Sequence, residues 1–261
     1  IELPQAQRFS SHQAKQFLEE TRPDSPVMLG SVEKEWSLDP NVSVRMQVRS
    51  LNGKVNLNRF RTTNATEEFS ELVRSLLTEM NYPPRVMKEL GRWIIEEENR
   101  PGLGQGRYAG YDFSPPGRAL HQIHELRLVS GFRSIGLTDE FRSTFTIHGS
   151  GNINPLHFTP ETWERFERAL GPDFPRVPPA ALQNQKTLRN YLEQDAVWEE
   201  VSGNYEFFTR EDDSYAVLHR LEKNGVIKRT REIYVYNAEE ETVDRKTRYP
   251  VQGTGGRGLS D

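Results

Sequence analysis

Two histidines and a glutamate in the middle of the chain have the residue types of a metal site. His121 and His124 are three residues apart, and Glu125 follows directly. On a helix this spacing would place both imidazoles on one side, where they could begin to hold a transition metal. The pattern identifies no third ligand, so we interpret the pair as surface or packing histidines.

A serine close to a histidine suggests nucleophilic catalysis. His148 lies next to the segment Gly149-Ser150-Gly151. Closeness in sequence does not make a catalytic triad, and no nucleophile elbow surrounds the serine. We therefore predict that the protein is not an enzyme. A hydrolase that uses Ser150 or the histidine pair is the alternative, and it predicts turnover of generic esters.

Acidic residues next to a glycine-rich segment suggest a calcium site. Glu96-Glu97-Glu98-Asn99 leads into residues 99–119, where glycine and proline predict a long irregular loop. Carboxylates beside such a loop are a common way of binding calcium. Glu97 and Glu98 are therefore candidate calcium ligands, and a solvated acidic helix end is the alternative interpretation.

We predict no other cofactor. The string Gly253-x-Gly255-x-x-Gly258 satisfies the dinucleotide fingerprint, but three residues follow it, too few for the helix that would hold the pyrophosphate.

The composition limits the classes of function. The chain has 261 residues, with 34 basic and 38 acidic side chains and a formal net charge of −4, so it has no general attraction for nucleic acid. It has no cysteine, which excludes disulfides and thiolate chemistry. No apolar run is long enough for a membrane helix. Because the chain starts at Ile1 without a methionine, we expect it to be a fragment with a segment upstream.

The elements that must position these residues include strands near both ends of the chain. Apolar and polar residues alternate from Val42 to Arg49 and again from Tyr215 to Leu221, which predicts half-buried strands. Asn224-Gly225 predicts a two-residue hairpin turn into a return strand over 226–236. A short helix is expected before the first strand, over 9–20.

Helices are expected between the strands. Asn64 and Glu67 read as a capping box for an amphipathic helix, and a second helix follows Pro83-Pro84, so we expect an antiparallel pair. Helix is also expected over 119–130. A second unit starts after Asn152-Ile153-Asn154-Pro155, where Thr159 can cap a helix and Pro178-Pro179 opens another. Large apolar residues in these helices are expected in the core, among them Trp93, Trp163 and Phe166.

Several segments in this order resemble one protein family. The chain from about Val42 to Tyr236 is similar to the K subunit family of minor pseudopilins of the type II secretion system, also called general secretion pathway protein K. The segments that carry the resemblance are Gly53-Lys54-Val55-Asn56-Leu57-Asn58, Trp93-Ile94, Glu125-Leu126-Arg127-Leu128-Val129 with Gly131-Phe132, Ile153-Asn154-Pro155, and Tyr215, Glu222, Asn224-Gly225-Val226 and Arg229 in the closing hairpin.

The resemblance implies an α+β fold. A pilin-like α/β module, with an N-terminal helix packed on an antiparallel sheet, would carry a large inserted α-helical domain made of two helix-pair units of the SAM-like type. The expected divisions are 1–58 for the first part of the module, 59–200 for the insert, 201–250 for the C-terminal sheet and 251–261 for a flexible tail.

The resemblance also implies a function without catalysis. The protein would cap the tip of the type II secretion pseudopilus and take part in the export of folded proteins across the outer membrane. Its partners would be the other minor pseudopilins, the I and J subunits. A hydrophobic N-terminal helix, absent from this fragment, would anchor it at the periplasmic face of the inner membrane, and the fragment itself would be soluble.

The family's calcium ligands match this chain only in part. They come from a Trp-Ile-Asp-x-Asp helix end and a Gly-Ala-Glu-Asp-x-Tyr loop. Here Ile95 stands at the first aspartate and Glu97 at the second, while Gly106 and Arg107 replace the acidic pair. His157 and Phe158 also depart from a Thr-Ala pair.

A DNA-binding adaptor is the alternative from another class, because helix-hairpin-helix modules begin with similar segments that contain asparagine. Such modules present backbone amides to phosphate from a Gly-x-Gly turn. Met80 to Pro84 contains no glycine and Leu170-Gly171-Pro172 contains one. We therefore predict no nucleic-acid partner.

Overall fold

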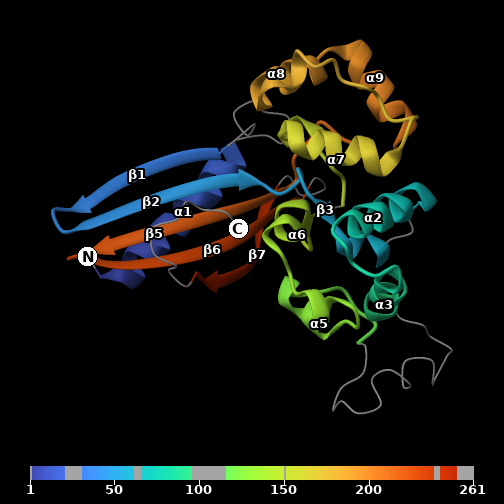
Figure 1. Cartoon of the computed structure of the whole chain (residues 1–261). Coiled ribbons are helices and arrows are strands. Elements are labelled where there is room, and N and C mark those ends of the chain that lie inside the picture. The colour runs from blue at the N-terminus through green and yellow to red at the C-terminus, as the bar shows by residue number, and fades with distance from the viewer. Residues whose placement is uncertain are drawn as a thin grey trace. The chain divides into compact units, whose positions relative to one another are not determined.

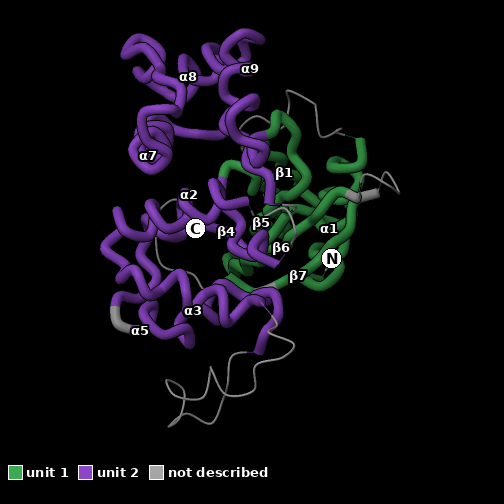
Figure 2. The backbone as a smooth tube through the Cα atoms, turned by 90° about the vertical axis from the view of Figure 1, so that its right-hand side faces the viewer, with its two compact units in different colours: residues 1–53, 148–150, 209–259 green, residues 54–147, 151–208, 260–261 purple. Residues whose placement is uncertain are grey.

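The chain forms two compact units, which we call the sheet unit and the helical unit (Figure 2). The computed structural model describes residues 2–20, 31–61, 66–95, 116–149, 151–237 and 242–251. The sheet unit is drawn from 1–53, 148–150 and 209–259, and the helical unit from 54–147, 151–208 and 260–261. The chain therefore leaves the sheet unit, forms the helical unit and returns.

The sheet unit begins with helix α1, Leu3–Glu20, which lies along one face of the sheet (Figure 1). Its buried side chains recur at helical spacing and form one stripe, which comprises Ala6, Gln7, Ser10, Ala14, Phe17 and Leu18. Two polar residues in the first half of the stripe hide the period from a reading of hydrophobicity, which is why the predicted helix began only at residue 9.

Five antiparallel strands form the sheet in the order β1-β2-β5-β6-β7. Their bounds are β1 Ser31–Asp39, β2 Val42–Ser50, β5 Ser214–Lys223, β6 Val226–Asn237 and β7 Thr242–Pro250. Strands β2 and β5 flank the helical unit in sequence, yet they pair along their whole length, from Val42 with Lys223 to Ser50 with Tyr215. This pairing closes the sheet around the insertion.

The predicted strands and hairpin are confirmed. Asn224 and Gly225 both have positive φ, 50° and 80°, as the two-residue turn requires. The two edge strands β1 and β7 were not predicted. They carry mostly charged and polar side chains, so their alternation gives little hydrophobic signal, and such edges resist pairing with another chain.

The helical unit contains short strands, α-helices and 3-10 helices. Their bounds are β3 Val55–Asn56, η2 Leu57–Arg61, α2 Glu67–Glu79, α3 Arg85–Ile94, η3 Ile123–Leu128, α5 Phe132–Ile135, α6 Asp139–Thr144, β4 Phe145–Thr146, η4 Pro155–His157, α7 Pro160–Leu170, η5 Ala181–Gln183, α8 Gln185–Leu192 and α9 Asp195–Asn204. Trp93, Trp163 and Phe166 are buried, as predicted for core residues. Among the helices within the described ranges, none has both the length and the apolar content to cross a bilayer.

Two halves of the helical unit repeat one plan. Strand β3 starts the first half and pairs in parallel with β4 at its end, while Ile153 starts the second half and forms a parallel bridge with Phe208 at its end. In each half an asparagine side chain accepts a backbone hydrogen bond just after the first strand, Asn56 from Asn58 at 2.9 Å and Asn154 from Leu156 at 3.0 Å. A 3-10 helix and a threonine-capped helix then follow.

Some local predictions were wrong. Helix α2 is capped by Thr66, whose hydroxyl accepts from the Phe69 amide, rather than by Asn64, which lies outside the described residues. The helix expected over 119–130 is the short 3-10 helix η3. Helix α2 packs closely on α7 of the other half. The two halves are therefore joined by a helix from each, a contact between distant segments that local spacing does not reveal.

Candidate functional site

The structure does not bring the sequence-predicted chemical residues together. Ser150, Glu97 and Glu98 lie outside the described residues, as do Gly253, Gly255 and Gly258. Within the described ranges, no three metal-ligating side chains form a cluster. The calcium site at Glu97 and Glu98 therefore stays a prediction.

The carboxylate of Glu125, beside the two histidines, binds backbone amides. Glu125 accepts hydrogen bonds from the amides of His121 and Gln122, both at 2.9 Å, and pairs with Arg118 at 3.1 Å. It is the capping residue of η3. These donors occupy the oxygens that a metal would need, which favours the packing interpretation of this segment.

His148 belongs to the sheet unit, as does Gly149, although the neighbouring sequence belongs to the helical unit. Gly149 has a φ of +96°, and a Cβ atom there would lie 2.1 Å from the Ser214 hydroxyl, so the glycine lets the chain approach the sheet. Burial, together with the charge of Arg231, lowers the pKa of His148 to about 4.

A serine, a histidine and a glutamate that the sequence analysis did not combine meet beneath α1. The Ser10 hydroxyl lies 2.6 Å from His219 Nδ1, and His219 Nε2 lies 3.1 Å from Glu232 Oε2. All three residues are fully buried. A carboxylate only accepts, so His219 Nε2 carries the proton that it donates to Glu232.

Glu232 is the centre of this cluster, which we call the Glu232 centre. Its carboxylate accepts from the hydroxyls of Tyr234, at 2.6 Å, and Ser11, at 3.0 Å, and it pairs with Arg245 and Arg248 from β7. Burial alone would raise the pKa of Glu232, but the hydrogen bonds from His219, Tyr234 and Arg248 and the charge of His219 outweigh it and hold the pKa far below its usual value. The centre thus joins α1, β5, β6 and β7.

The order serine, histidine, carboxylate is that of a hydrolase triad, but this arrangement cannot do that chemistry. Ser10 is fully buried on the sheet-facing side of α1, so no substrate reaches its hydroxyl. A nucleophile must also face a site where backbone amides stabilise an oxyanion. The Glu232 centre instead links α1 to the sheet through hydrogen bonds and ion pairs.

A sequence signal for this centre did exist. His219 occupies an inward position of β5, where its neighbours at spacing two are apolar, and Glu232 occupies an inward position of β6 beside Tyr234. The pairing of Val217 with Glu232 places Glu232 diagonal to His219 across the strands. Inward polar residues on neighbouring strands predict a buried pair. The contact of Ser10 with that pair could not be predicted, because it depends on where α1 packs on the sheet.

The motif Gly53–Asn58, which carried the family resemblance, has a structural role. Asn58 Nδ2 donates to the carbonyls of Leu120 and Ile147, at 2.9 and 2.8 Å, and Asn58 Oδ1 accepts from the Leu120 amide at 2.7 Å. One side chain thus holds three distant segments of the first half together. In the same half, Gly131 has a φ of +101°, and a Cβ atom there would lie 2.4 Å from Val86.

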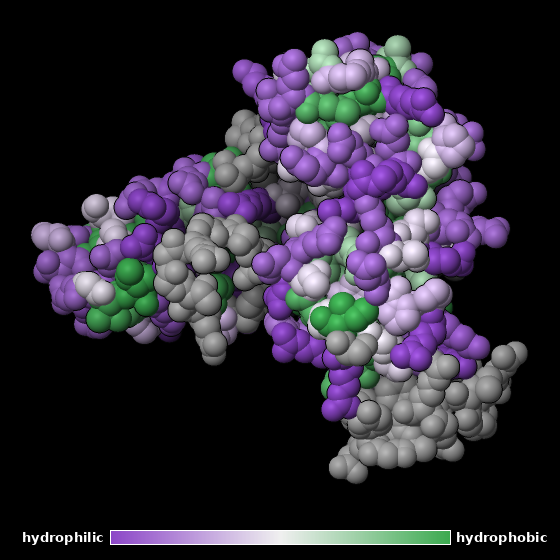
Figure 3. All heavy atoms as spheres, viewed as in Figure 1, coloured by the Kyte–Doolittle hydropathy of each residue, from purple (hydrophilic) through white to green (hydrophobic). Residues whose placement is uncertain are grey.

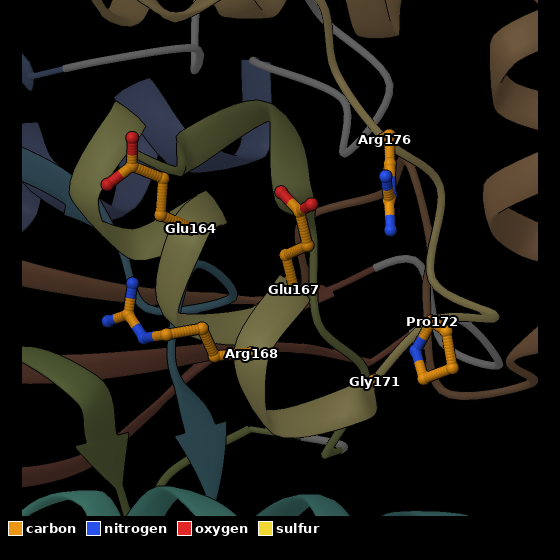
Figure 4. Close-up of a pocket in the computed structure, with 6 residues that line it drawn as sticks. All are labelled: Glu164, Glu167, Arg168, Gly171, Pro172 and Arg176. Atoms are coloured by element: carbon orange, nitrogen blue, oxygen red, sulfur yellow. The ribbon is translucent and has the colours of Figure 1, made fainter.

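An open hollow of about 320 Å³ lies on α7 and the turn after it (Figure 4). It is lined by Glu164, Glu167, Arg168, Gly171, Pro172 and Arg176. Its charged side chains are of both signs and do not converge on one point, and Arg168 is already bound to Glu79, at 2.9 Å from Nε. This hollow offers no selective binding site.

The described residues thus define a class of protein: an antiparallel sheet with a helix on one face and a helical unit inserted between two adjacent strands. The sequence matches no protein-family model and no curated protein. Among solved structures, it is similar to a chain of the crystal structure of the GspK-GspI-GspJ complex from the enterotoxigenic Escherichia coli Type 2 Secretion System. The identity is 12%, the TM-score is 0.65, and the match covers 96% of this chain and 97% of that chain.

The comparison confirms the predicted fold class. The chain has a GspK-like α+β fold, with both the sheet unit and the inserted helical unit inside the matched region. At 12% identity the likeness concerns the fold, and function needs a separate argument.

Proposed function

We propose that the protein is a K-type minor pseudopilin that acts without catalysis. It caps the tip of a type II secretion pseudopilus and takes part in the export of folded proteins across the outer membrane. It binds the I-type and J-type subunits, and a hydrophobic helix upstream of α1 anchors it at the periplasmic face of the inner membrane. In this proposal the helical unit acts by its volume, because it prevents further subunits from being added above it.

One observation carries the proposal. The structural likeness extends over nearly the whole of both chains and includes the inserted helical unit, so it is more specific than a shared pilin-like sheet. That solved structure contains GspK together with GspI and GspJ. The burial of the Ser10, His219 and Glu232 cluster adds support, because the arrangement most like a catalytic site is closed to substrate.

The proposal is tested by association with the expected partners. The 261-residue chain should co-elute in size-exclusion chromatography with soluble I-type and J-type minor pseudopilins from the same operon. The exposed side of α1 is the expected contact, so Arg8→Glu with Lys15→Glu should weaken the complex at least tenfold. Lys186→Glu, at an exposed position of α8, is the matched control and should leave it intact. If no pairwise or three-way mixture associates, the proposal is wrong.

We also propose that Glu97 and Glu98 are the residues that would hold calcium if this chain binds it. The ligand set differs from the family's, because the C-cap residue that follows α3 is Ile95, an apolar side chain that is 44% exposed, where the family has an aspartate. Added calcium should raise the melting temperature and a chelator should lower it, and Glu97→Gln with Glu98→Gln should abolish both changes. If the melting temperature is the same with added calcium and with chelator, the calcium site is excluded.

A further inference from the structure

The tip of the β5–β6 hairpin exposes two large apolar side chains. Val226 is 60% exposed and Ile227 is 43% exposed, and both come directly after the turn at Asn224-Gly225. The other exposed large apolar residues within the described ranges belong to the helical unit. The space-filling view shows hydrophobic residues exposed on the sheet unit (Figure 3).

The apolar pair is followed by cations. Lys228 is exposed and Arg229 is half-buried, and Lys223 lies opposite Val226 in the strand register. Because side chains alternate between the two faces of a sheet, Val226 and Lys228 share the face of α1, and Ile227 and Arg229 share the other face.

In the described part of this end, Glu2, Asp39 and Glu222 already have partners. Glu2 pairs with Lys223 at 2.7 Å. Asp39 accepts from the Asn41 amide at 2.9 Å, and Glu222 pairs with Arg220 at 3.2 Å. These three acidic groups thus bind partners other than Lys228 and Arg229.

The hairpin tip lies at the end of the sheet where α1 begins. Lys223 contacts Glu2, and Leu3 packs against the cluster of Val42, Val44 and Leu221. Figure 1 places the start of the chain beside the same end of β5 and β6. If a membrane helix continues α1 upstream, as the proposed function holds, the hairpin tip is the part of the sheet unit nearest the bilayer.

We infer that the β5–β6 hairpin tip is a membrane-contact surface that binds anionic phospholipid headgroups. Val226 and Ile227 enter the boundary between headgroups and acyl chains, and Lys228 and Arg229 attract the anionic surface. This inference rests on the proposed function for its geometry. Two apolar residues bind a membrane weakly by themselves, so the contact matters when an anchor holds the hairpin close to the surface.

The absence of cysteine allows a clean test with one environment-sensitive dye. Asn41→Cys places the dye in the β1–β2 turn beside the hairpin, because the Asn224 amide donates to the Asn41 carbonyl at 3.2 Å. Glu211→Cys places it at an exposed position before the start of β5, at the other end of the same strand. An N-terminal histidine tag on nickel-chelating lipid then tethers the chain to vesicles at the proposed anchor point.

On vesicles of phosphatidylethanolamine and phosphatidylglycerol, the dye at position 41 should shift to shorter wavelength and be quenched severalfold less by iodide. The dye at position 211 should not change. Val226→Ser with Ile227→Ser should abolish the shift, and Lys228→Ser with Arg229→Ser should reduce it most at low salt, as should replacement by phosphatidylcholine vesicles. Melting temperatures near that of the parent chain would show that both double variants fold.

Three results would overturn the inference. They are equal signals from both dye positions, a shift that survives the loss of both apolar side chains, and a tip variant that loses the I-type or J-type partner while its membrane signal is unchanged. The last would assign the tip to a protein partner. The proposed function is tested separately, because the partner mixtures contain no lipid.

Discussion

The interiors of the two units are built on different principles. The helical unit is held by aromatic rings in contact, such as Phe158 with Phe166 at 4.5 Å and Trp163 with Phe174 at 4.7 Å between centroids. The sheet unit has apolar clusters too, but its centre beneath α1 is the buried carboxylate of Glu232 with its ring of donors.

The two interiors meet different requirements. Apolar burial is non-directional, and it suffices for the role proposed for the helical unit, which requires volume and stability. Hydrogen bonds and ion pairs are directional, so the Glu232 centre fixes the rotation and the position of α1 along the sheet. The partner contacts proposed for the exposed side of α1 would need such a fixed orientation.

The largest effect should come from removing the central carboxylate. Glu232→Ala leaves the buried His219 without its acceptor and Arg245 and Arg248 without their counter-charge. The Tyr234 hydroxyl keeps only its longer hydrogen bond, to the Ser11 carbonyl at 3.3 Å. Removing one partner of a buried ion pair typically costs roughly 3–5 kcal/mol of unfolding free energy. Hydrogen exchange followed by mass spectrometry should show the loss in α1, β5 and β6, with the helical unit protected as before.

Glu222→Ala is the matched control on β5. Glu222 pairs with Arg220 at 3.2 Å, and both side chains are more than one-third exposed. An exposed pair of this kind contributes about 0–1 kcal/mol. If Glu232→Ala costs no more than Glu222→Ala, the buried centre does not fasten α1, and the contrast between the two interiors fails.

The sequence predicted the two kinds of core unequally. The aromatic core was accessible because Trp163 and Phe166 lie at helical spacing behind a threonine cap, a local pattern. The Glu232 centre combines α1, β5, β6 and β7, and β7 itself was not predicted because its sequence, Thr242–Pro250, is mostly polar. Local periodicity reports which face of an element is buried, but it does not report which distant polar groups meet there.

Local sequence patterns also suggested a metal site where the structure has a helix cap. The sequence placed Glu125 beside two histidines that could begin a metal site and identified no third ligand, and in the structure its carboxylate accepts hydrogen bonds from the amides of His121 and Gln122. Pairs of carboxylates and amides inside one turn are common structural caps. The resemblance segments around Asn58 and Gly131 were better guides, because their roles in the fold require those residue types.

Replacing Asn58 should lower the stability of the helical unit, by less than Glu232→Ala lowers that of the sheet unit. Asn58→Ala removes three hydrogen bonds to the backbone of Leu120 and Ile147, which are both buried. Leaving buried donors and acceptors unsatisfied costs about 2–3 kcal/mol in total when some are reached by water. Chemical denaturation followed by tryptophan fluorescence should detect the loss, and hydrogen exchange should place it in the first half of the helical unit.

Asn190→Ala, at an exposed position of α8, provides the control for this prediction and should change stability by no more than about 0.5 kcal/mol. A loss of protection in the sheet unit instead of the first half would contradict the role of Asn58 as the link between its three segments.

Acid should destabilise the sheet unit more than the helical unit, and this is the smallest of the three expected effects. His148 belongs to the sheet unit, and its pKa of about 4 lies below the ordinary 6.5 because of burial and Arg231. The unfolded chain therefore binds the proton more tightly than the folded chain, so stability is complete above pH 6.5 and falls as the pH decreases toward 4. The full lowering of this pKa corresponds to about 3 kcal/mol. Because the ring is partly exposed, the expected loss is about 2 kcal/mol, and hydrogen exchange should place it in the sheet unit.

Two substitutions assign the acid effect to its source. His148→Gln should flatten the decline between pH 6.5 and 4.5, because the amide does not titrate. Glu232→Gln should leave that decline in place and change the stretch below pH 4.5, since a carboxyl with a lowered pKa loses its contribution only when acid begins to protonate it in the unfolded chain. If the helical unit loses protection first, or if His148→Gln leaves the slope unchanged, the acid sensitivity does not arise from the sheet unit and its buried polar groups.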